Sequence, residues 1–230
     1  MRRSTYWTAS TIALVTLATT AASANVVFDN GVPAATDLPP AYPLTQSVQA
    51  EDFTLPEPSV VTALRFHAIE RHDGYAGSIY WSIRNDESGQ PSANEIAGDT
   101  TAAVVRTPTG VIRPDYFNAA ESIYSIDVEP LILAAGDYWL LLHNGPLDYD
   151  RADTSAGFLQ WEGTIGQRGE VGVQDPTPFE GVWEQTIGER SFSLVGVPEP
   201  GAKLTLGVAA VVMVRRTRAL KRGAAPQPAA

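Results

Sequence analysis

The fold class is decided by residues 137–143, Asp-Tyr-Trp-Leu-Leu-Leu-His. Side chains on a β-strand point alternately to opposite faces of the sheet. In this segment both faces are apolar, with Tyr138, Leu140 and Leu142 on one and Trp139 and Leu141 on the other. A strand that is apolar on both faces is typical of the centre of a covered sheet. The segment therefore predicts a central strand in a layered β-structure.

Shorter segments with a period of two lie on both sides of this strand. In residues 59–69 the period places Val60, Thr62, Leu64, Phe66 and Ala68 on one face. Residues 78–84 do the same with Ile79, Trp81 and Ile83, and residues 122–128 with Tyr124, Ile126 and Val128. Further strands are expected at residues 157–162 and 191–196, with weaker candidates at 26–28, 47–53, 102–106 and 182–186.

Turn residues separate these segments, among them Asp73-Gly74, Pro108-Thr109-Gly110 and Asn144-Gly145-Pro146. No long segment between them has a helical period. The pattern predicts an all-β fold, a single antiparallel and jelly-roll-like β-sandwich over residues 25–196. A signal helix is expected before this domain and a hydrophobic helix after it.

Charge is distributed unevenly along the 230 residues. All 26 acidic residues lie between residues 25 and 200, where eight Arg and no Lys oppose them, so the formal charge there is 8 − 26 = −18. Such a domain repels phosphate backbones, and no nucleic-acid partner is expected. The chain has no cysteine, which excludes thiolate catalysis and zinc sites built from cysteine.

Residues 1–24 have the organisation of a secretory signal peptide. Arg2 and Arg3 precede an uncharged segment that contains the apolar stretch 12–18, and Ala22-Ser23-Ala24 has the small residues of a cleavage site. We expect signal peptidase to cut between Ala24 and Asn25, and the chain to be exported through the inner membrane.

The C-terminal segment has three parts in a fixed order. Val197-Pro198-Glu199-Pro200 comes first, the apolar run 204–214 follows, and Arg215, Arg216 and Arg218 form a basic cluster behind it. The prolines keep the linker extended, the apolar run prefers lipid, and the basic cluster halts translocation. Residues 197–222 are therefore predicted as a sorting and anchor segment, and 223–230 as a disordered tail.

This tail resembles the PEP-CTERM sorting signal of Gram-negative bacteria that make extracellular polysaccharide. The resemblance implies that an exosortase-type membrane protease recognises Val197, Pro198, Glu199 and Pro200 and removes the tail. The anchor is then transient, and the protein ends in the cell envelope or outside the cell. The same tail also ends some proteins labelled ice-binding. Residues 49–53, 78–83, 135–140 and 190–196 resemble mostly uncharacterised sandwich proteins with this tail, which implies architecture and export only.

The sequence contains no Gly-x-Ser-x-Gly, His-Glu-x-x-His or P-loop motif. Asp127 and Glu129 would place two acids on one face of a strand, roughly 6–7 Å apart, and paired carboxylates are the catalytic groups of glycosidases. His67 and the His72-Asp73 turn are a weaker candidate for a metal site. We expect no enzymatic activity and no obligatory cofactor.

Two sets of residues are candidates for ligand contact. Asp148, Asp150 and Asp153 are closely spaced carboxylates that suit Ca²⁺, although Arg151 supplies neutralisation within the segment. Trp161, Trp183 and Tyr149 are the aromatic candidates for stacking on sugar rings, because Trp81 and Trp139 lie on apolar strand faces and are expected in the core.

Four functions remain open at this point. The first is a non-enzymatic envelope or matrix protein, linked to exopolysaccharide. The second is a carbohydrate-binding module for that polysaccharide. A glycoside-active enzyme using Asp127 and Glu129 ranks third. Ice binding ranks last, because it usually needs a regular array of threonines and the threonines here are scattered.

Overall fold

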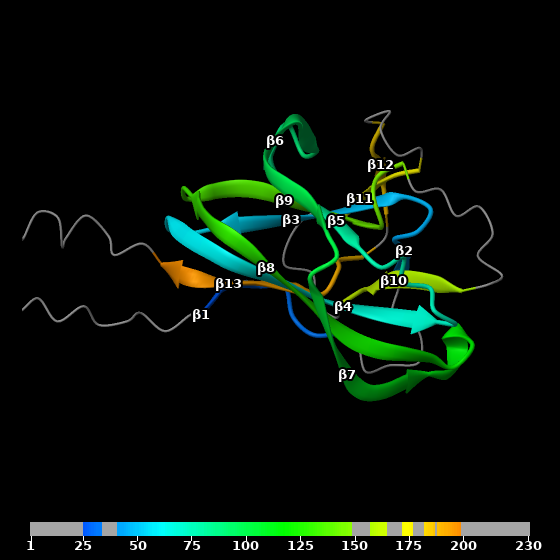
Figure 1. Cartoon of the computed structure of the whole chain (residues 1–230). Helices are drawn as coiled ribbons and strands as arrows, with labels where there is room; N and C mark the ends of the chain where they lie inside the picture. The colour runs from blue at the N-terminus through cyan, green and yellow to red at the C-terminus, as the bar shows by residue number, and fades with distance from the viewer. Residues whose placement is uncertain are drawn as a thin grey trace, which may run out of the picture.

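The computed structural model describes residues 25–33, 41–148, 157–164, 172–176, 182–186 and 188–198. These form an all-β structure of two antiparallel sheets that pack face to face, and the larger sheet curls into a half-barrel (Figure 1). The described residues include no helix of the length and hydropathy needed to cross a membrane. The predicted signal helix and C-terminal hydrophobic helix lie outside them.

The larger sheet is built around its two longest strands, β4 and β8, which pair along most of their length. β13 and then β10 pair with the other edge of β4. The members of this sheet are β1 (Asn25–Asp29), β2 (Ala41–Pro43), β4 (Ser59–Arg71), β7 (Val104–Arg113), β8 (Ala119–Leu133), β10 (Phe158–Glu162) and β13 (Phe192–Pro198). A short 3-10 helix, η1 (Pro114–Tyr116), connects β7 to β8.

The smaller sheet has the strand order β12-β11-β3-β9-β5-β6. Its members are β3 (Val48–Leu55), β5 (Ile79–Asp86), β6 (Pro91–Thr101), β9 (Gly136–Asn144), β11 (Val173–Asp175) and β12 (Glu184–Gln185). β9 contains the segment 137–143 and lies between β3 and β5. Its residues from Tyr138 to Asn144 are all buried, which confirms the predicted central strand.

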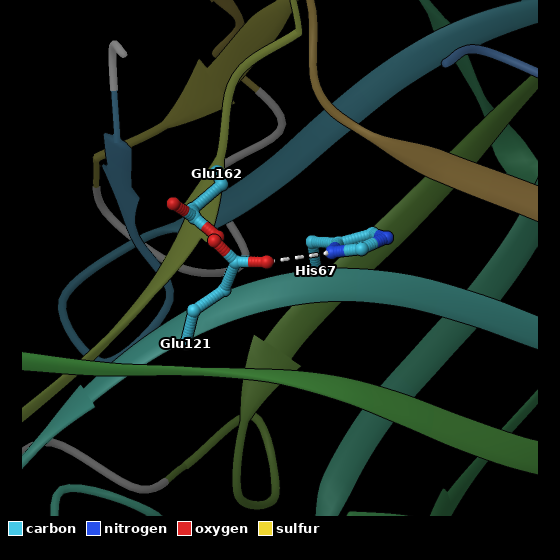
Figure 2. Close-up of side chains that lie close together, drawn as sticks. All are labelled: His67, Glu121 and Glu162. Carbon is cyan, nitrogen blue, oxygen red and sulfur yellow. Dashed lines mark hydrogen bonds and ion pairs between the residues drawn. The ribbon is translucent and has the colours of Figure 1, made fainter. Parts of the chain in front are cut away.

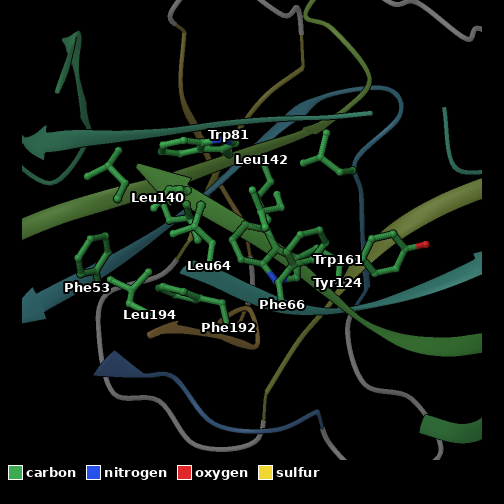
Figure 3. Packing of buried hydrophobic residues seen from close by; sticks show 14 of the residues in the cluster. Phe53, Leu64, Phe66, Trp81, Tyr124, Leu140, Leu142, Trp161, Phe192 and Leu194 are labelled. Carbon is green, nitrogen blue, oxygen red and sulfur yellow. The ribbon is translucent and has the colours of Figure 1, made fainter. Parts of the chain in front are cut away.

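The main core lies between the two sheets (Figure 3). Alternate residues of β9 and β5 face those of β4 and β8 across it, as the period of two predicts. Trp161 contacts Phe66 and Phe192 edge to face, with ring centroids 6.1 and 5.9 Å apart. Aromatic pairs in this arrangement add about 0.5–1.5 kcal/mol each beyond the area that they bury.

A second and smaller cluster explains why β9 is apolar on both faces. Trp139 and Leu141 point away from the main core and pack with Val48, Ala50, Tyr80 and Val173. Leu147 and Trp183 cover part of this cluster. The outer face of the smaller sheet is therefore also closed to water around β9.

The face assignment of β4 is only partly correct. Leu64, Phe66 and Ala68 enter the main core as expected, but Val61 does so in place of Val60 and Thr62. The β4–β8 register shifts between Val61 and Ala63. Because an irregularity of this kind adds a residue to the count, it reverses the faces of all residues before it.

Other boundaries also differ from the sequence-based expectation. The Pro108-Thr109-Gly110 turn lies inside β7, where the β7–β8 register shifts between Pro108 and Ile112. The chain reverses instead after η1, at Phe117 and Asn118, which both have a positive φ. Strands β2, β6 and β11 were not expected from the sequence.

The first and last described strands are neighbours. β1 pairs with β13, and Asn25 lies opposite Gly196. β13 continues through Val197 and Pro198, which pair with Val60 and Ser59 of β4. The folded domain therefore extends two residues beyond the predicted boundary at residue 196.

Candidate functional site

A cleft of about 530 Å³ opens at the edge of the sandwich. It lies between β6, the last strand of the smaller sheet, and β8 of the larger sheet. Both sheets contribute residues to it, so the fold itself brings together segments that are about 30 residues apart in the chain. A concave site between two rigid layers is the usual place for a small-molecule or sugar ligand.

The wall from the smaller sheet is built by a cross-strand pair. Trp81 on β5 lies opposite Asp99 on β6, and paired residues in an antiparallel sheet point to the same face. Trp81 is 7% exposed and belongs to the main core, yet it also lines the cleft. The cleft therefore has an aromatic floor with a carboxylate beside it.

The wall from the larger sheet is a distorted part of β8. Asp127 pairs with Ala63 and Leu131 pairs with Val61, so residues 128–130 of β8 lie opposite Thr62 alone. Pro130 has no N–H to donate to the sheet, and a bulge of this kind turns side chains to new directions. Glu129 and Pro130 consequently line the cleft together with Asp127.

The rim of the cleft is acidic. Asp99, Asp127 and Glu129 are all exposed, whereas Val128, between the two acids of β8, is buried. This confirms that Asp127 and Glu129 lie on the solvent side of one strand. No basic residue is among the described residues that line the cleft. The charged residues among those that line it are therefore all acidic.

A second group of titratable side chains lies on the outer face of the larger sheet. His67 of β4, Glu121 of β8 and Glu162 of β10 have donor atoms within 4.8 Å of one another (Figure 2). His67 Nδ1 lies 3.2 Å from Glu121 Oε1. Among the described residues this is the one group of three or more His, Asp or Glu with the spacing of a metal site.

Arg113 changes the interpretation of this group. Its Nε donates to Glu162 Oε1 at 2.8 Å, and its Nη2 donates to Glu121 Oε2 at 2.7 Å. The guanidinium thus binds one oxygen of each carboxylate, and a metal ion would enter beside a positive charge that already compensates one of them. We interpret the four residues as an internal ion network that fixes the end of β7 on β8 and β10.

Glu162 is the residue of that network whose pKa is shifted. Burial and the neighbouring Glu121 carboxylate raise the pKa of Glu162 to about 7, and Arg113 opposes this rise. Glu162 is fully buried, and its Oε2 has no hydrogen-bond partner among the described residues. Burial is the larger cause of this shift, and the second carboxylate adds to it because one cation cannot compensate two negative charges.

A third polar group fills one end of the space between the sheets. Arg190 is fully buried and donates to Glu51 Oε2 at 3.0 Å and to Gln49 Oε1. Its guanidinium lies 4.1 Å from the centre of the Tyr42 ring. Burial raises the pKa of Glu51 and lowers that of Arg190, and the ion pair counteracts both shifts. This group has no opening to solvent, and we assign it a structural role.

The aromatic residues predicted to contact carbohydrate have different positions. Trp161 is 0% exposed and donates from Nε1 to the Ser191 carbonyl at 2.8 Å, so the expectation that it lies at the surface is wrong. Trp161 pairs with Tyr42 of β2, a strand that was not expected from the sequence, and β2 helps to cover it. Trp183 is half-buried against the Trp139 cluster. Tyr149 lies outside the described residues.

The remaining predicted sites are only partly visible. Asp148 is exposed, while Asp150 and Asp153 lie outside the described residues, so the calcium hypothesis is untested. Of the sorting motif, Val197 and Pro198 belong to β13, and Glu199 and Pro200 lie outside the described residues, as do Ala24, Arg215, Arg216 and Arg218. His72 stands at a turn with a φ of 48°.

Comparison with known proteins does not assign this chain to a family. No protein-family model matches this chain, and none of the curated proteins matches it. The cleft was not found from the sequence because its two walls belong to different sheets. Two of its acids, Asp127 and Glu129, were nevertheless singled out by their spacing on one strand.

Proposed function

We propose that the chain is an exported, non-enzymatic protein of the cell envelope or extracellular matrix whose sandwich domain binds a glycan in the β6–β8 cleft. The observation that carries the binding part is the concave site itself, in which Trp81 and its cross-strand partner Asp99 line one wall and Asp127 and Glu129 belong to the other. The exposed part of the buried Trp81 ring gives the C–H groups of a sugar an apolar surface, and carboxylates accept hydrogen bonds from its hydroxyl groups.

The export part rests on the two ends of the sequence. The signal-peptide pattern of residues 1–24 and the three-part tail of residues 197–222 support export and PEP-CTERM sorting, with signal peptidase and an exosortase-type protease as processing partners. The finer description of the sandwich as jelly-roll-like is part of the same proposal. It rests on the period of two in the sequence and on the strand order, in which neighbouring strands of a sheet are often distant in the chain.

Two features make a catalytic role for Asp127 and Glu129 the weaker alternative. A glycosidase needs a carboxyl group that apolar surroundings keep protonated, so that it acts as general acid. Asp127 and Glu129 are both exposed. Neither residue therefore has the apolar surroundings that a general acid requires.

Binding is tested by tryptophan fluorescence and calorimetry with oligosaccharides released from the host's exopolysaccharide. We expect binding to change the emission of Trp81, so that Trp81→Phe, which keeps an aromatic ring in the core, loses the signal. Trp183→Phe, on the other face of the smaller sheet, serves as the control and keeps it. Failure of every oligosaccharide to bind would reject the binding proposal. Hydrolysis of the sugar by the parent but not by Asp127→Asn would reject the non-enzymatic role.

Export is tested separately by the intact mass of the protein recovered from fractions of host cells. We expect a species that begins at Asn25 and ends near Val197–Pro200, in the envelope or the medium. A species in the inner membrane that retains residues 204–222 would reject the sorting proposal, because the tail would then be a permanent anchor.

A further inference from the structure

We propose that His67, Glu121 and Glu162 bind a divalent cation such as Zn²⁺ on the outer face of the larger sheet (Figure 2). The three side chains come from β4, β8 and β10, and β4 pairs with both of the other strands. One donor atom of each residue lies within 4.8 Å of the other two. The inference goes beyond the proposed glycan binding, because none of these residues lines the β6–β8 cleft.

The observation that points to a ligand is an oxygen atom of Glu162. The side chain of Glu162 is fully buried, and its Oε2 has no hydrogen-bond partner among the described residues. Nearly all buried polar atoms in native proteins have a partner, and an atom without one requires an explanation such as a bound ion. A cation in contact with Oε2 and with the neighbouring Glu121 carboxylate supplies the missing partner.

The ion network with Arg113 leaves room for a second cation. Arg113 binds Oε1 of Glu162 and Oε2 of Glu121, so the other oxygen of each carboxylate remains for an ion. One guanidinium compensates one of the two negative charges, and a divalent cation compensates the second. Carboxylates that bind a metal ion are themselves oriented by an outer hydrogen-bond partner, and we assign this role to Arg113.

The donor atoms indicate which ion the site takes. One imidazole nitrogen and two carboxylate oxygens suit Zn²⁺, which binds these atoms at about 2.0–2.2 Å. Two ligands of a tetrahedral ion with such bonds lie about 3.3–3.5 Å apart, and His67 Nδ1 lies 3.2 Å from Glu121 Oε1. Ca²⁺ requires six to eight oxygens, which three side chains do not supply. His67 is the most exposed of the three, with 18% of its side chain accessible, so water can complete the coordination from its side.

The strands hold the three ligands in position before an ion binds. The β4–β8 register makes His67 and Glu121 diagonal neighbours on one face of the sheet. The β4–β10 register places Trp161 opposite Ala68, so Glu162, the next residue of β10, lies beside His67. Metal sites on strands are more precise than sites on loops. A bound ion would connect the three strands at their outer face.

The test is calorimetry with ZnCl₂ on the full chain, purified without a histidine tag and freed of metal with a chelator. We expect one Zn²⁺ per chain with a Kd of about 1 μM or below. The midpoint of thermal unfolding should rise with added Zn²⁺, because the assembled site exists only in the folded chain. Co²⁺ in place of Zn²⁺ should give the visible absorption of a tetrahedral ion, and an excess of CaCl₂ should not displace it.

The decisive variant is His67→Gln with Glu162→Gln. It removes two ligands, and we expect a loss of affinity larger than the roughly 10–100-fold that the loss of an outer partner costs. The matched control is His72→Gln with Glu184→Gln, which removes the same residue types at exposed positions of a turn and of β12, and it should keep the affinity. If circular dichroism shows that the decisive variant does not fold, Glu162→Gln alone replaces it, because the amide keeps an acceptor for Arg113.

Three outcomes would overturn the inference, and all of them leave the proposed glycan binding intact. The first is absence of Zn²⁺ binding to the parent. The second is binding of several ions per chain with the same weak affinity, which would identify them as adventitious. The third is an equal affinity of the parent and the decisive variant, or an equal loss in the control, since either would place the ion elsewhere on the chain.

Discussion

The guanidinium of Arg190 and the carboxylate of Glu51 form a fully buried ion pair between residues that are 139 positions apart in the chain. Glu51 also accepts a hydrogen bond from Asn30 Nδ2 at 3.2 Å. The pair thus connects β3 of the smaller sheet with the chain segments just after β1 and just before β13 of the larger sheet. It therefore links the two layers through buried polar groups.

Replacing Arg190 with Met should therefore destabilise the domain strongly. The substitution leaves the Glu51 carboxylate buried without its cation, and breaking a buried pair from one side costs about 3–5 kcal/mol. Urea denaturation followed by fluorescence measures the change in the free energy of unfolding. Arg65→Met, at an exposed position of β4, is the control and should change it by less than about 0.5 kcal/mol. Equal effects of the two substitutions would contradict the structural role of the pair.

Gly172→Ala should disturb the Arg190–Glu51 ion pair by a steric collision. A Cβ at this position would collide with Arg190 Nη1 and Glu51 Oε2, so the ion pair has to open. We expect a loss of about 1–3 kcal/mol, as for other overpacked interiors. In the Arg190→Met background the loss should be clearly smaller, because the nearer of the two collision partners, Arg190 Nη1, is absent. Strict additivity of the two substitutions in a double-mutant cycle would rule this explanation out.

Glu162→Gln should change how stability depends on pH. Glu162 faces Arg113, Glu121 and, through Glu121, His67, and its pKa in the folded state is raised to about 7. Because this pKa exceeds that of the unfolded chain, the contribution of Glu162 is full below about pH 4.5 and is lost as the pH rises through 7.

The measurement is chemical denaturation of the parent and Glu162→Gln at pH values from 5 to 8. The parent should lose stability relative to the variant as the pH rises, by at most about 1.4 kcal/mol per pH unit. Glu184→Gln, at an exposed acid of β12, controls for general charge effects. Parallel curves for the parent and Glu162→Gln would show that the residue does not take up a proton in this range.

Trp161→Ala should cost about 3–5 kcal/mol of folding free energy, as large-to-small substitutions of buried aromatics do. The indole is fully buried, and the substitution also removes its N–H donor from the Ser191 carbonyl, which keeps the bond from the His67 N–H. Trp183→Ala, at a half-buried indole, should cost about 1 kcal/mol. If Trp161→Ala kept full stability and lost glycan binding, the original assignment of Trp161 to a ligand surface would be correct and the core assignment wrong.

The predictable part of this fold is the part that depends on local alternation. Segment 137–143 is apolar on both faces, and it indeed forms a strand covered on both faces. Ile79, Trp81 and Ile83 enter the core for the same reason. The predicted face of Val60 and Thr62 is wrong, because a register shift depends on the partner strand. The sequence of β4 contains no sign of this shift.

The candidate site was predictable only in pieces. The spacing of Asp127 and Glu129 marked them as two acids on one exposed face, and the structure agrees. Their position next to Trp81 and Asp99 depends on how the two sheets meet at an open edge, which no local pattern contains. Gln49, Glu51 and Arg190 were overlooked for a similar reason, since a polar residue on an inward face is explained only when its distant partner is known.

The pairing of Asn25 with Gly196 also has a consequence for how the domain is oriented when it is attached to a cell or a polymer. A chain cut before Asn25 and again near Val197–Pro200 would have its new amino and carboxyl ends side by side on one edge of the larger sheet. Whichever end joins the domain to a cell or to a polymer, the sandwich would therefore be attached through the same edge and would expose the same opposite side. Many copies attached in this way would form a layer of uniformly oriented domains.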